Sequence, residues 1–252
     1  MSGAWRAARQ SAGCRLILAA LLLCFAGGTI NGCRDNGTPL GPGTSPAFRL
    51  RVSVGDRFLY NGWEIDWYGY RIEPTATRHT WLVISTAGQV AGFSDVIVII
   101  DSAVTRTTSA LHLDTLYFRS AADGSLYRYG FLAELILRRE KRLIQPRWDL
   151  LIFPEAGSSG SWTVGPTDSL GTQKVTGTIA VGEDYFDVAV NGVRSAYQAR
   201  RCDLLGPALE FYLWMADSPS SLPRMEEYPD PYNEFTRGSV LILSDIVTAR
   251  NQ

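Results

Sequence analysis

The stretch at residues 57–70, RFLYNGWEIDWYGY, decides how the chain folds. Runs of large apolar residues lie on both sides of Asn61-Gly62. An Asn-Gly pair between such runs is typical of a type I′ hairpin turn, because both central residues of that turn take positive φ. In the second run Trp63, Ile65 and Trp67 alternate with acidic residues, which is the period of a strand buried on one face. The sequence therefore predicts a β-hairpin with its turn at Asn61-Gly62.

The same alternation of strands and turns continues along the chain. Further strands are expected at residues 48–54, 79–86, 96–104, 111–119, 126–131, 175–181, 185–190, 195–201, 209–216 and 240–247. Asp123-Gly124 and Asn191-Gly192 separate neighbouring strands, as hairpin turns do. Turns at such short intervals favour a mainly β fold. We expect a curved antiparallel sheet, in the form of a half-barrel or a sandwich, with at most one or two short helices.

Two segments depart from this pattern. Residues 131–144, FLAELILRREKRLI, contain good helix formers with apolar residues at helical spacing. The same residues could equally continue the preceding strand, so the sequence does not decide between a helix and a strand. Residues 217–233 contain four prolines. Because proline cannot donate a hydrogen bond to a neighbouring strand, no central strand is expected there.

Several short motifs resemble those of exported, β-rich bacterial lipoproteins of uncharacterised function. Residues 54–60, VGDRFLY, are similar to the opening of that family's domain, and residues 123–129, DGSLYRY, to its central turn. Residues 153–162 resemble its FP…GSW block, and residues 188–200 its strand pair with a small turn. The resemblance implies a curved sheet similar to the half-barrels of lipoprotein carriers. It brings no catalytic residues to transfer.

The first 32 residues have the layout of a secretory signal peptide. Arg6, Arg9 and Arg15 precede an apolar run at residues 16–25, and small and polar residues follow it up to Gly32. A membrane-spanning helix needs about 20 predominantly apolar residues, and this run is much shorter. We therefore expect residues 1–32 to be removed after export.

The end of this segment, Ile30-Asn31-Gly32-Cys33, resembles a bacterial lipobox, whose cysteine is acylated and becomes the new N-terminus. The resemblance implies that Cys33 is the lipidation site. Residues 33–46 are then a lipidated tether, because the Gly- and Pro-rich tract has the composition of a flexible spacer. We expect residues 47–252 to form a single β-rich domain. Arg34 is similar to the enteric pattern for transfer to the outer membrane, so the protein is expected to be lipid-anchored in the bacterial cell envelope.

Charge and cysteine content narrow the possible functions. Removal of the signal leaves 21 of the 24 basic residues against 25 acidic ones, so the exported chain carries no excess of positive charge for nucleic acid. With Cys14 and Cys24 removed and Cys33 acylated, Cys202 has no cysteine left to pair with. We expect its thiol to pack as a small apolar group.

No motif in the sequence carries catalytic chemistry. His79 and His112 fall on expected strands without the ligand spacing that a zinc site needs. His112 and Asp114 share one strand face, which a solvated polar face explains. We therefore expect a monomeric, non-enzymatic protein with no metal and no cofactor.

The remaining evidence about function in the sequence comes from the aromatic residues. Trp63, Trp67, Tyr68 and Tyr70 crowd the first hairpin. The simplest explanation for these four residues is that they pack in the core, since aromatic residues pair well across strands. The alternative is an apolar groove that binds a lipid, a glycan or a partner strand, with these four as ligand-binding residues.

Three functions follow from these observations, in falling order. The first is a membrane-anchored exported lipoprotein that binds an apolar ligand or acts as a carrier. The second is an assembly lipoprotein that binds another envelope protein through a sheet edge. A hydrolase comes last, because the sequence shows no catalytic constellation.

Overall fold

The structure is a computed structural model that describes residues 48–140, 145–152, 159–164, 173–206, 209–229 and 236–251. The chain divides into two units, residues 1–43 and residues 44–252, and all described residues belong to the second. The signal peptide, the whole tether with Cys33, and the first part of the FP…GSW block lie outside the described residues.

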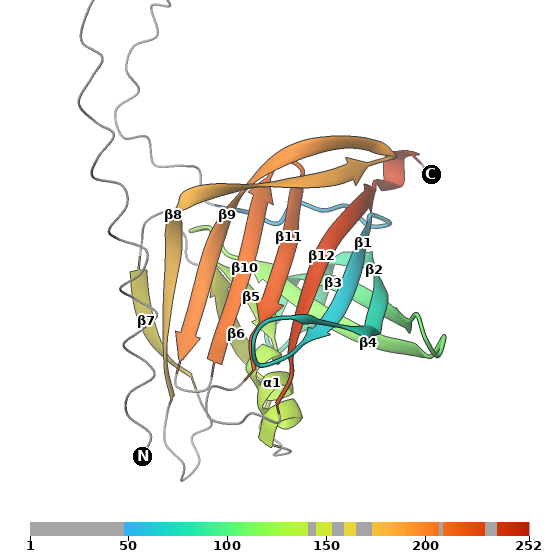
Figure 1. The fold of residues 1–252 in the computed structure, drawn as a ribbon. Helices are drawn as coiled ribbons and strands as arrows, with labels where there is room; N and C mark the ends of the chain where they lie inside the picture. Colours follow the sequence, from blue (N-terminus) through green and yellow to red (C-terminus); the bar gives the residue numbers. More distant parts are fainter. Residues whose placement is uncertain are drawn as a thin grey trace, which may run out of the picture. The chain divides into compact units, whose positions relative to one another are not determined.

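Within the described ranges, twelve strands form one sheet and one α-helix accompanies it (Figure 1). The strands are β1 (Arg57–Ile65), β2 (Arg71–Val90), β3 (Phe93–Thr105), β4 (Leu111–Ser120), β5 (Leu126–Tyr129), β6 (Trp148–Ile152), β7 (Ser159–Val164), β8 (Gln173–Val190), β9 (Val193–Gly206), β10 (Leu209–Asp217), β11 (Ser220–Glu227) and β12 (Gly238–Val247). Helix α1 (Phe131–Glu140) lies between β5 and β6 in the chain, and a 3-10 turn, η1 (Ala249–Asn251), follows β12. The prediction of a mainly β fold with at most one or two short helices is confirmed.

The strand order is β6-β5-β4-β3-β2-β1-β12-β11-β10-β9-β8-β7. Neighbours in this order are antiparallel, as the paired registers show. The end of β8 also pairs in parallel with β12, where Ala189 faces Asp245. This extra pairing closes β8–β12 into a ring of five strands. Strands β1–β6 extend the sheet from β12, so the predicted curved antiparallel sheet is confirmed.

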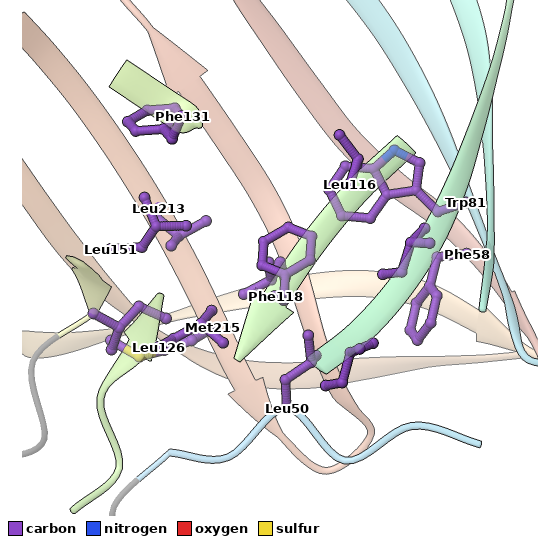
Figure 2. Close-up of a cluster of buried hydrophobic side chains, with 14 of the residues drawn as sticks. Leu50, Phe58, Trp81, Leu116, Phe118, Leu126, Phe131, Leu151, Leu213 and Met215 are labelled. Atoms are coloured by element: carbon purple, nitrogen blue, oxygen red, sulfur yellow. The ribbon is translucent and has the colours of Figure 1, made fainter. Parts of the chain in front are cut away.

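The hydrophobic core lies between the strands of the ring and the β1–β6 extension (Figure 2). Trp81 on β2 and Phe118 on β4 pack with ring centroids 5.9 Å apart. Phe131 at the start of α1 packs on Phe211 of β10, at 4.8 Å. Cys202 is buried in the same core, and its thiol donates a hydrogen bond to the Leu151 carbonyl at 3.4 Å.

The prediction of a hairpin turn at Asn61-Gly62 is wrong. Strand β1 continues through both residues, and the chain turns at residues 66–70 instead. There the Asp66 carbonyl accepts the Gly69 N–H at 2.9 Å, and Gly69 has a φ of +82°. A glycine takes this left-handed conformation without a steric penalty, which makes it suited to the tight turn.

Gly62 serves close packing rather than a turn. A Cβ placed on it would lie 2.5 Å from Oγ1 of Thr77 on β2 and 2.8 Å from Cδ2 of Leu241 on β12. A larger residue there would force the Thr77 and Leu241 side chains to shift, so glycine lets the strands on both sides of β1 approach closely.

The other two predicted turns are confirmed. Gly124 has a φ of +91°, and the Ala121 N–H donates to the Ser125 carbonyl across that turn at 2.8 Å. Between β8 and β9, Asn191 and Gly192 have φ values of +51° and +82°. Both are the positive angles of a type I′ turn.

The exclusion of a central strand from residues 217–233 is also wrong, because β11 lies between β10 and β12. Pro223 is tolerated there for a local reason. The register between β10 and β11 shifts between Trp214 and Ala216, and pairing with β12 begins only at Arg224. Proline is compatible with a strand at such an irregularity, since no ladder hydrogen bond is required of it.

Of the two alternatives for residues 131–144, helix and strand, the structure shows a helix over Phe131–Glu140. Residues 141–144 lie outside the described part. Gly130, with a φ of +75°, turns the chain out of β5. The Asp149 carboxylate of β6 then accepts the Leu132 N–H at 2.9 Å, which satisfies a backbone donor at the helix start. In the part of the chain that the structure describes, no helix has the length and apolarity to cross a bilayer.

Candidate functional site

A half-open cavity of about 560 Å³ is lined by both parts of the sheet and by α1. Its walls come from β1–β5, α1 and the facing strands β10, β11 and β12. The volume falls in the range of about 300–1,000 Å³ that is usual for small-molecule sites.

The cavity wall has a polar and an apolar part. The inward residues of β2 are Thr77, His79, Trp81 and Val83, at alternate positions on one strand face. Thr77 and His79 are half-buried, whereas Trp81 is 5 % exposed and Val83 only 1 %. Threonines and carboxylates, among them the buried Glu227, line the polar part, and the apolar part is made by Trp81, Leu116, Phe131 and Phe211.

The register of β1 against β2 places small and aromatic side chains beside the polar ones. Gly62 faces Thr77, and Tyr60 faces His79. The Tyr60 ring packs on Trp81, with centroids 4.7 Å apart. Burial, and after it the negative charge of Asp101, raises the pKa of the Tyr60 phenol. Tyr60 therefore stays neutral at the base of this polar group.

Three polar side chains in the cavity wall form a hydrogen-bonded row. Thr77 Oγ1 lies 3.0 Å from His79 Nε2, and His79 Nδ1 lies 2.9 Å from an oxygen of Asp101. The side chains of His79 and Asp101 are 17 % and 13 % exposed. Because the Asp101 carboxylate can only accept, Nδ1 carries a proton, and in the tautomer without a proton on Nε2 that nitrogen accepts the Thr77 hydroxyl.

The cavity wall carries more acidic than basic groups. Its carboxylates belong to Glu64, Asp101, Asp114, Glu134 and Glu227, and its arginine is Arg128. Arg128 forms an ion pair with Glu134, and its guanidinium lies 5.5 Å from the ring centre of Phe131. The arrangement disfavours an anionic ligand and suits a neutral or cationic polar group.

Of the four aromatic residues singled out from the sequence, Trp63 lines the cavity. The guanidinium of Arg71 stacks over its ring at 4.4 Å. Trp67, Tyr68 and Tyr70 lie instead in the β1–β2 turn and are 42 %, 76 % and 71 % exposed. The structure therefore separates Trp63 from the other three.

The turn with the three exposed aromatic residues is well ordered by hydrogen bonds. One oxygen of the Asp66 carboxylate accepts the backbone N–H groups of Tyr68 and Tyr70, each at 2.9 Å. The strands on either side of the turn reach the cavity wall at Glu64 and Pro74. The aromatic turn thus connects two strand ends that border the cavity.

Sequence reasoning missed the Thr77–His79–Asp101 row. Thr77 and His79 stand two residues apart on β2, a spacing that places both side chains on one face, but the strand predicted there began only at His79. That signal was available, but Asp101 joins them only through the pairing of β2 with β3. His112, the other histidine, is exposed on β4. Over the described ranges, no three His, Cys, Asp or Glu side chains converge as metal ligands.

Comparison with known proteins finds similarity at the level of solved structures. A candidate lipoprotein of Parabacteroides distasonis is 9 % identical, with a TM-score of 0.40, over 81 % of this chain and 99 % of that one. A candidate exported protein of Bacteroides fragilis with a YmcC-like fold is 11 % identical, with a TM-score of 0.41, over 79 % of this chain and 99 % of that one. No protein-family model and no curated protein matches the sequence. Likeness of this degree assigns neither an activity nor a ligand to this chain.

Proposed function

We propose that the chain is an exported, lipid-anchored protein of the bacterial envelope whose β domain binds or carries an amphipathic, mainly apolar ligand. The observation that supports binding is the cavity of about 560 Å³, polar near Thr77 and apolar at Trp81 and Phe131. An apolar wall supplies affinity through burial, and a few polar groups orient the ligand.

The anchor is proposed from the sequence. A signal peptide, the lipobox-like Ile30-Asn31-Gly32-Cys33 and a spacer follow one another in the order that lipid attachment requires. Each buried methylene contributes about 0.8 kcal/mol, and stable anchoring takes more than one acyl chain. Acylation of Cys33 would hold the domain at a membrane, and Arg34 favours the outer membrane.

The polar end of the ligand is expected to be neutral or cationic. The cavity wall carries the five carboxylates named above against one arginine, and Arg128 is already paired with Glu134. A free carboxylate or phosphate would meet like charge there, which costs more in a partly buried site than in water.

Trp63 and the aromatic turn have separate roles in this proposal. Trp63 contacts bound ligand directly because it lines the cavity. Trp67, Tyr68 and Tyr70 contact ligand or lipid on the way in, because amphipathic aromatic rings are favoured where apolar and aqueous surroundings meet.

The binding site is tested by filling the cavity. Thr105 on β3 lines it, and its chain neighbour Val104 points to the other face of the strand. Thr105→Trp should abolish binding of a fluorescent alkylglycerol ether, a neutral amphipathic probe, whereas Val104→Trp should bind it like the wild type. Fluorescence titration gives both affinities, and circular dichroism checks that both variants fold. Equal affinity in the two variants would place the ligand elsewhere.

A sheet edge supports the alternative role in assembly. β7 ends the strand order and, among the described strands, pairs only with β8. An open edge can accept a strand from a partner protein. If assembly is the function, crosslinks to an envelope protein should map to β7, and Thr105→Trp should leave them unchanged.

A further inference from the structure

We propose that Thr77, His79 and Asp101 form a catalytic row in which the Thr77 hydroxyl is the nucleophile for cleavage of a neutral carboxylic ester. This inference rests on the proposed function, since the cavity must admit the apolar part of the ester. It goes further by assigning a reaction to the polar part of the cavity wall.

The distances are those of a nucleophile, a base and a group that orients the base. Thr77 Oγ1 lies 3.0 Å from His79 Nε2, and Nδ1 of the same ring lies 2.9 Å from Asp101. Hydrogen-bond reach of about 2.6–3.2 Å at both contacts is the geometric sign of an activated hydroxyl. With Asp101 holding the proton on Nδ1, Nε2 is the basic nitrogen and faces the Thr77 hydroxyl.

The fold holds the three residues in place through strand register. Thr77 and His79 share one face of β2, and the residue of β3 that faces His79 is Ala103. The small side chain of Ala103 leaves room for the imidazole to reach Asp101, which stands two residues along β3 on the same face. Rigid strands therefore position the row, rather than a loop.

The Thr77 hydroxyl borders open space on the cavity side. Thr77 lines the cavity, and the residue that faces it across the sheet is Gly62. A Cβ at Gly62 would lie 2.5 Å from Thr77 Oγ1 and 3.1 Å from Cδ2 of His79. Glycine at this position leaves the nucleophile and the base without a covering side chain from β1.

The electrostatic surroundings suit a histidine that gains a proton during the reaction. Asp101 faces Asp114 directly across the β3–β4 pair, and both line the cavity. Two like charges in facing positions destabilise a sheet unless a cation lies near them. The imidazolium that forms when Thr77 attacks would lie within hydrogen-bond reach of Asp101, whose charge is opposite to its own.

The chemical steps balance with water as the second substrate. Thr77 Oγ1 bonds to the ester carbonyl carbon while its proton passes to His79 Nε2. The tetrahedral intermediate then breaks the bond to the alcohol oxygen, which takes the proton from Nε2 and leaves as the alcohol. Water attacks the acyl-Thr77 ester, gives one proton to Nε2, and releases the carboxylic acid as Thr77 regains its proton.

The apolar part of the cavity wall indicates which esters fit. The reacting carbonyl would lie at Thr77, and Trp81, Leu116 and Phe131 of the same cavity offer an apolar surface. An acyl chain of medium length can bury itself there while a neutral alcohol such as glycerol stays near the threonines. Octanoyl esters should therefore react faster than acetyl esters.

The test measures hydrolysis of p-nitrophenyl octanoate and labelling by a fluorophosphonate probe, with the labelled peptide identified by mass spectrometry. The wild type should hydrolyse the ester and carry the label on Thr77. Thr77→Val should lose both, and Thr77→Ser should retain both because it keeps the hydroxyl. His79→Gln and Asp101→Asn should lower the rate by about 10²–10⁴-fold, the usual contribution of general acid–base catalysis.

Thr80→Val is the matched control, because Thr80 lies on the same strand with its side chain on the opposite face. It should hydrolyse the ester at the wild-type rate. Binding of the fluorescent alkylglycerol ether, which has no ester to cleave, is measured for every variant and shows that its cavity is folded.

The outcomes separate the two proposals. If the wild type binds the ether but neither cleaves the ester nor takes the label, the catalytic row is wrong and the binding function stands. Turnover that persists in Thr77→Val, with the label on another residue, also overturns the row. If the wild type does not bind the ether, the proposed function fails together with this inference.

Discussion

Because Gly62 has no side chain, β1, β2 and β12 can pack closely at that position. Thr77 Oγ1 and Leu241 Cδ2 occupy the space that a Cβ would need, at 2.5 and 2.8 Å. The same residue leaves the Thr77 hydroxyl uncovered, so stability and the candidate site depend on one position.

The first prediction is that Gly62→Ala destabilises the domain. Inserting a methyl group into a closely packed region costs about 1–3 kcal/mol. Urea unfolding should show a lower midpoint with an unchanged slope. The clash with Thr77 is tested by a cycle with Thr77→Ala, because neighbouring changes that share a clash are not additive. The double variant should lose less than the sum of the single losses, and a wild-type midpoint for Gly62→Ala would contradict the packing described here.

The second prediction concerns Tyr60 and alkaline pH. Its pKa is raised above the ordinary value of 10.0, chiefly by burial, so the folded state binds the phenol proton more tightly than the unfolded state. Its contribution to stability is therefore complete below pH 10.0 and is lost as pH rises further. One proton of difference corresponds to about 1.4 kcal/mol per pH unit.

Tyr60→Phe removes this titration and should flatten the decline of unfolding free energy above pH 10.0. The decline should not vanish, because burial also raises the pKa values of Tyr212 and Tyr228. Urea unfolding at a series of alkaline pH values compares the slopes. Equal slopes for wild type and variant would show that Tyr60 titrates normally in the folded protein.

Among the elements, the β8–β9 hairpin closes the five-strand ring. Its turn residue Asn191 accepts the Thr248 N–H at 2.9 Å through its side-chain oxygen and donates to the Thr248 hydroxyl at 3.0 Å. The Asn191 N–H also donates to the Ile246 carbonyl at 2.8 Å. These bonds fasten the hairpin tip to the end of β12.

The third prediction is that Asn191→Ala lowers the unfolding free energy by about 1–3 kcal/mol, since it leaves partly buried polar groups without partners. Alanine is also strained at the φ of +51° found here. Asn191→Gly separates the two causes, because glycine adopts this angle freely but makes no side-chain bonds. It should recover part of the loss. Full recovery would mean that the bonds to Thr248 contribute nothing.

At the scale of the whole molecule, the proposed anchor and the folded domain are separate features of the chain. The described domain begins at Phe48, and Cys33 precedes it by a Gly- and Pro-rich tract. The domain should therefore fold alike with and without lipid, and only its location should change.

The fourth prediction follows from this separation. Cys33→Ser should release the protein from the membrane fraction of its bacterial host, since no thiol remains to be acylated. Fractionation followed by intact-mass measurement checks the location and the state of the signal peptide. Cys202→Ser is the control and should remain in the membrane. A mature Cys33→Ser protein that stays in the membrane would refute the lipoprotein assignment.

The sequence by itself determined the fold class and most of the strands, although the strand predicted at residues 48–54 does not form. Alternation of apolar and polar residues is a local property, and so are the turn preferences of Asp123-Gly124 and Asn191-Gly192, which the structure confirms. The helical alternative at residues 131–144 was also visible from local propensity, although the deciding contact, from Asp149 to the Leu132 N–H, comes from another strand.

Only the tertiary structure decided which strands meet and what lies between them. Asn61-Gly62 has the local preference of a turn, but packing of Thr77 and Leu241 against Gly62 holds it in a strand. Pro223 belongs to a central strand because the register shifts beside it. The Thr77–His79–Asp101 row exists because β2 and β3 pair at one register, and register depends on which faces are buried across the whole sheet. Local sequence carries no information about that choice, so the candidate site emerged only with the fold.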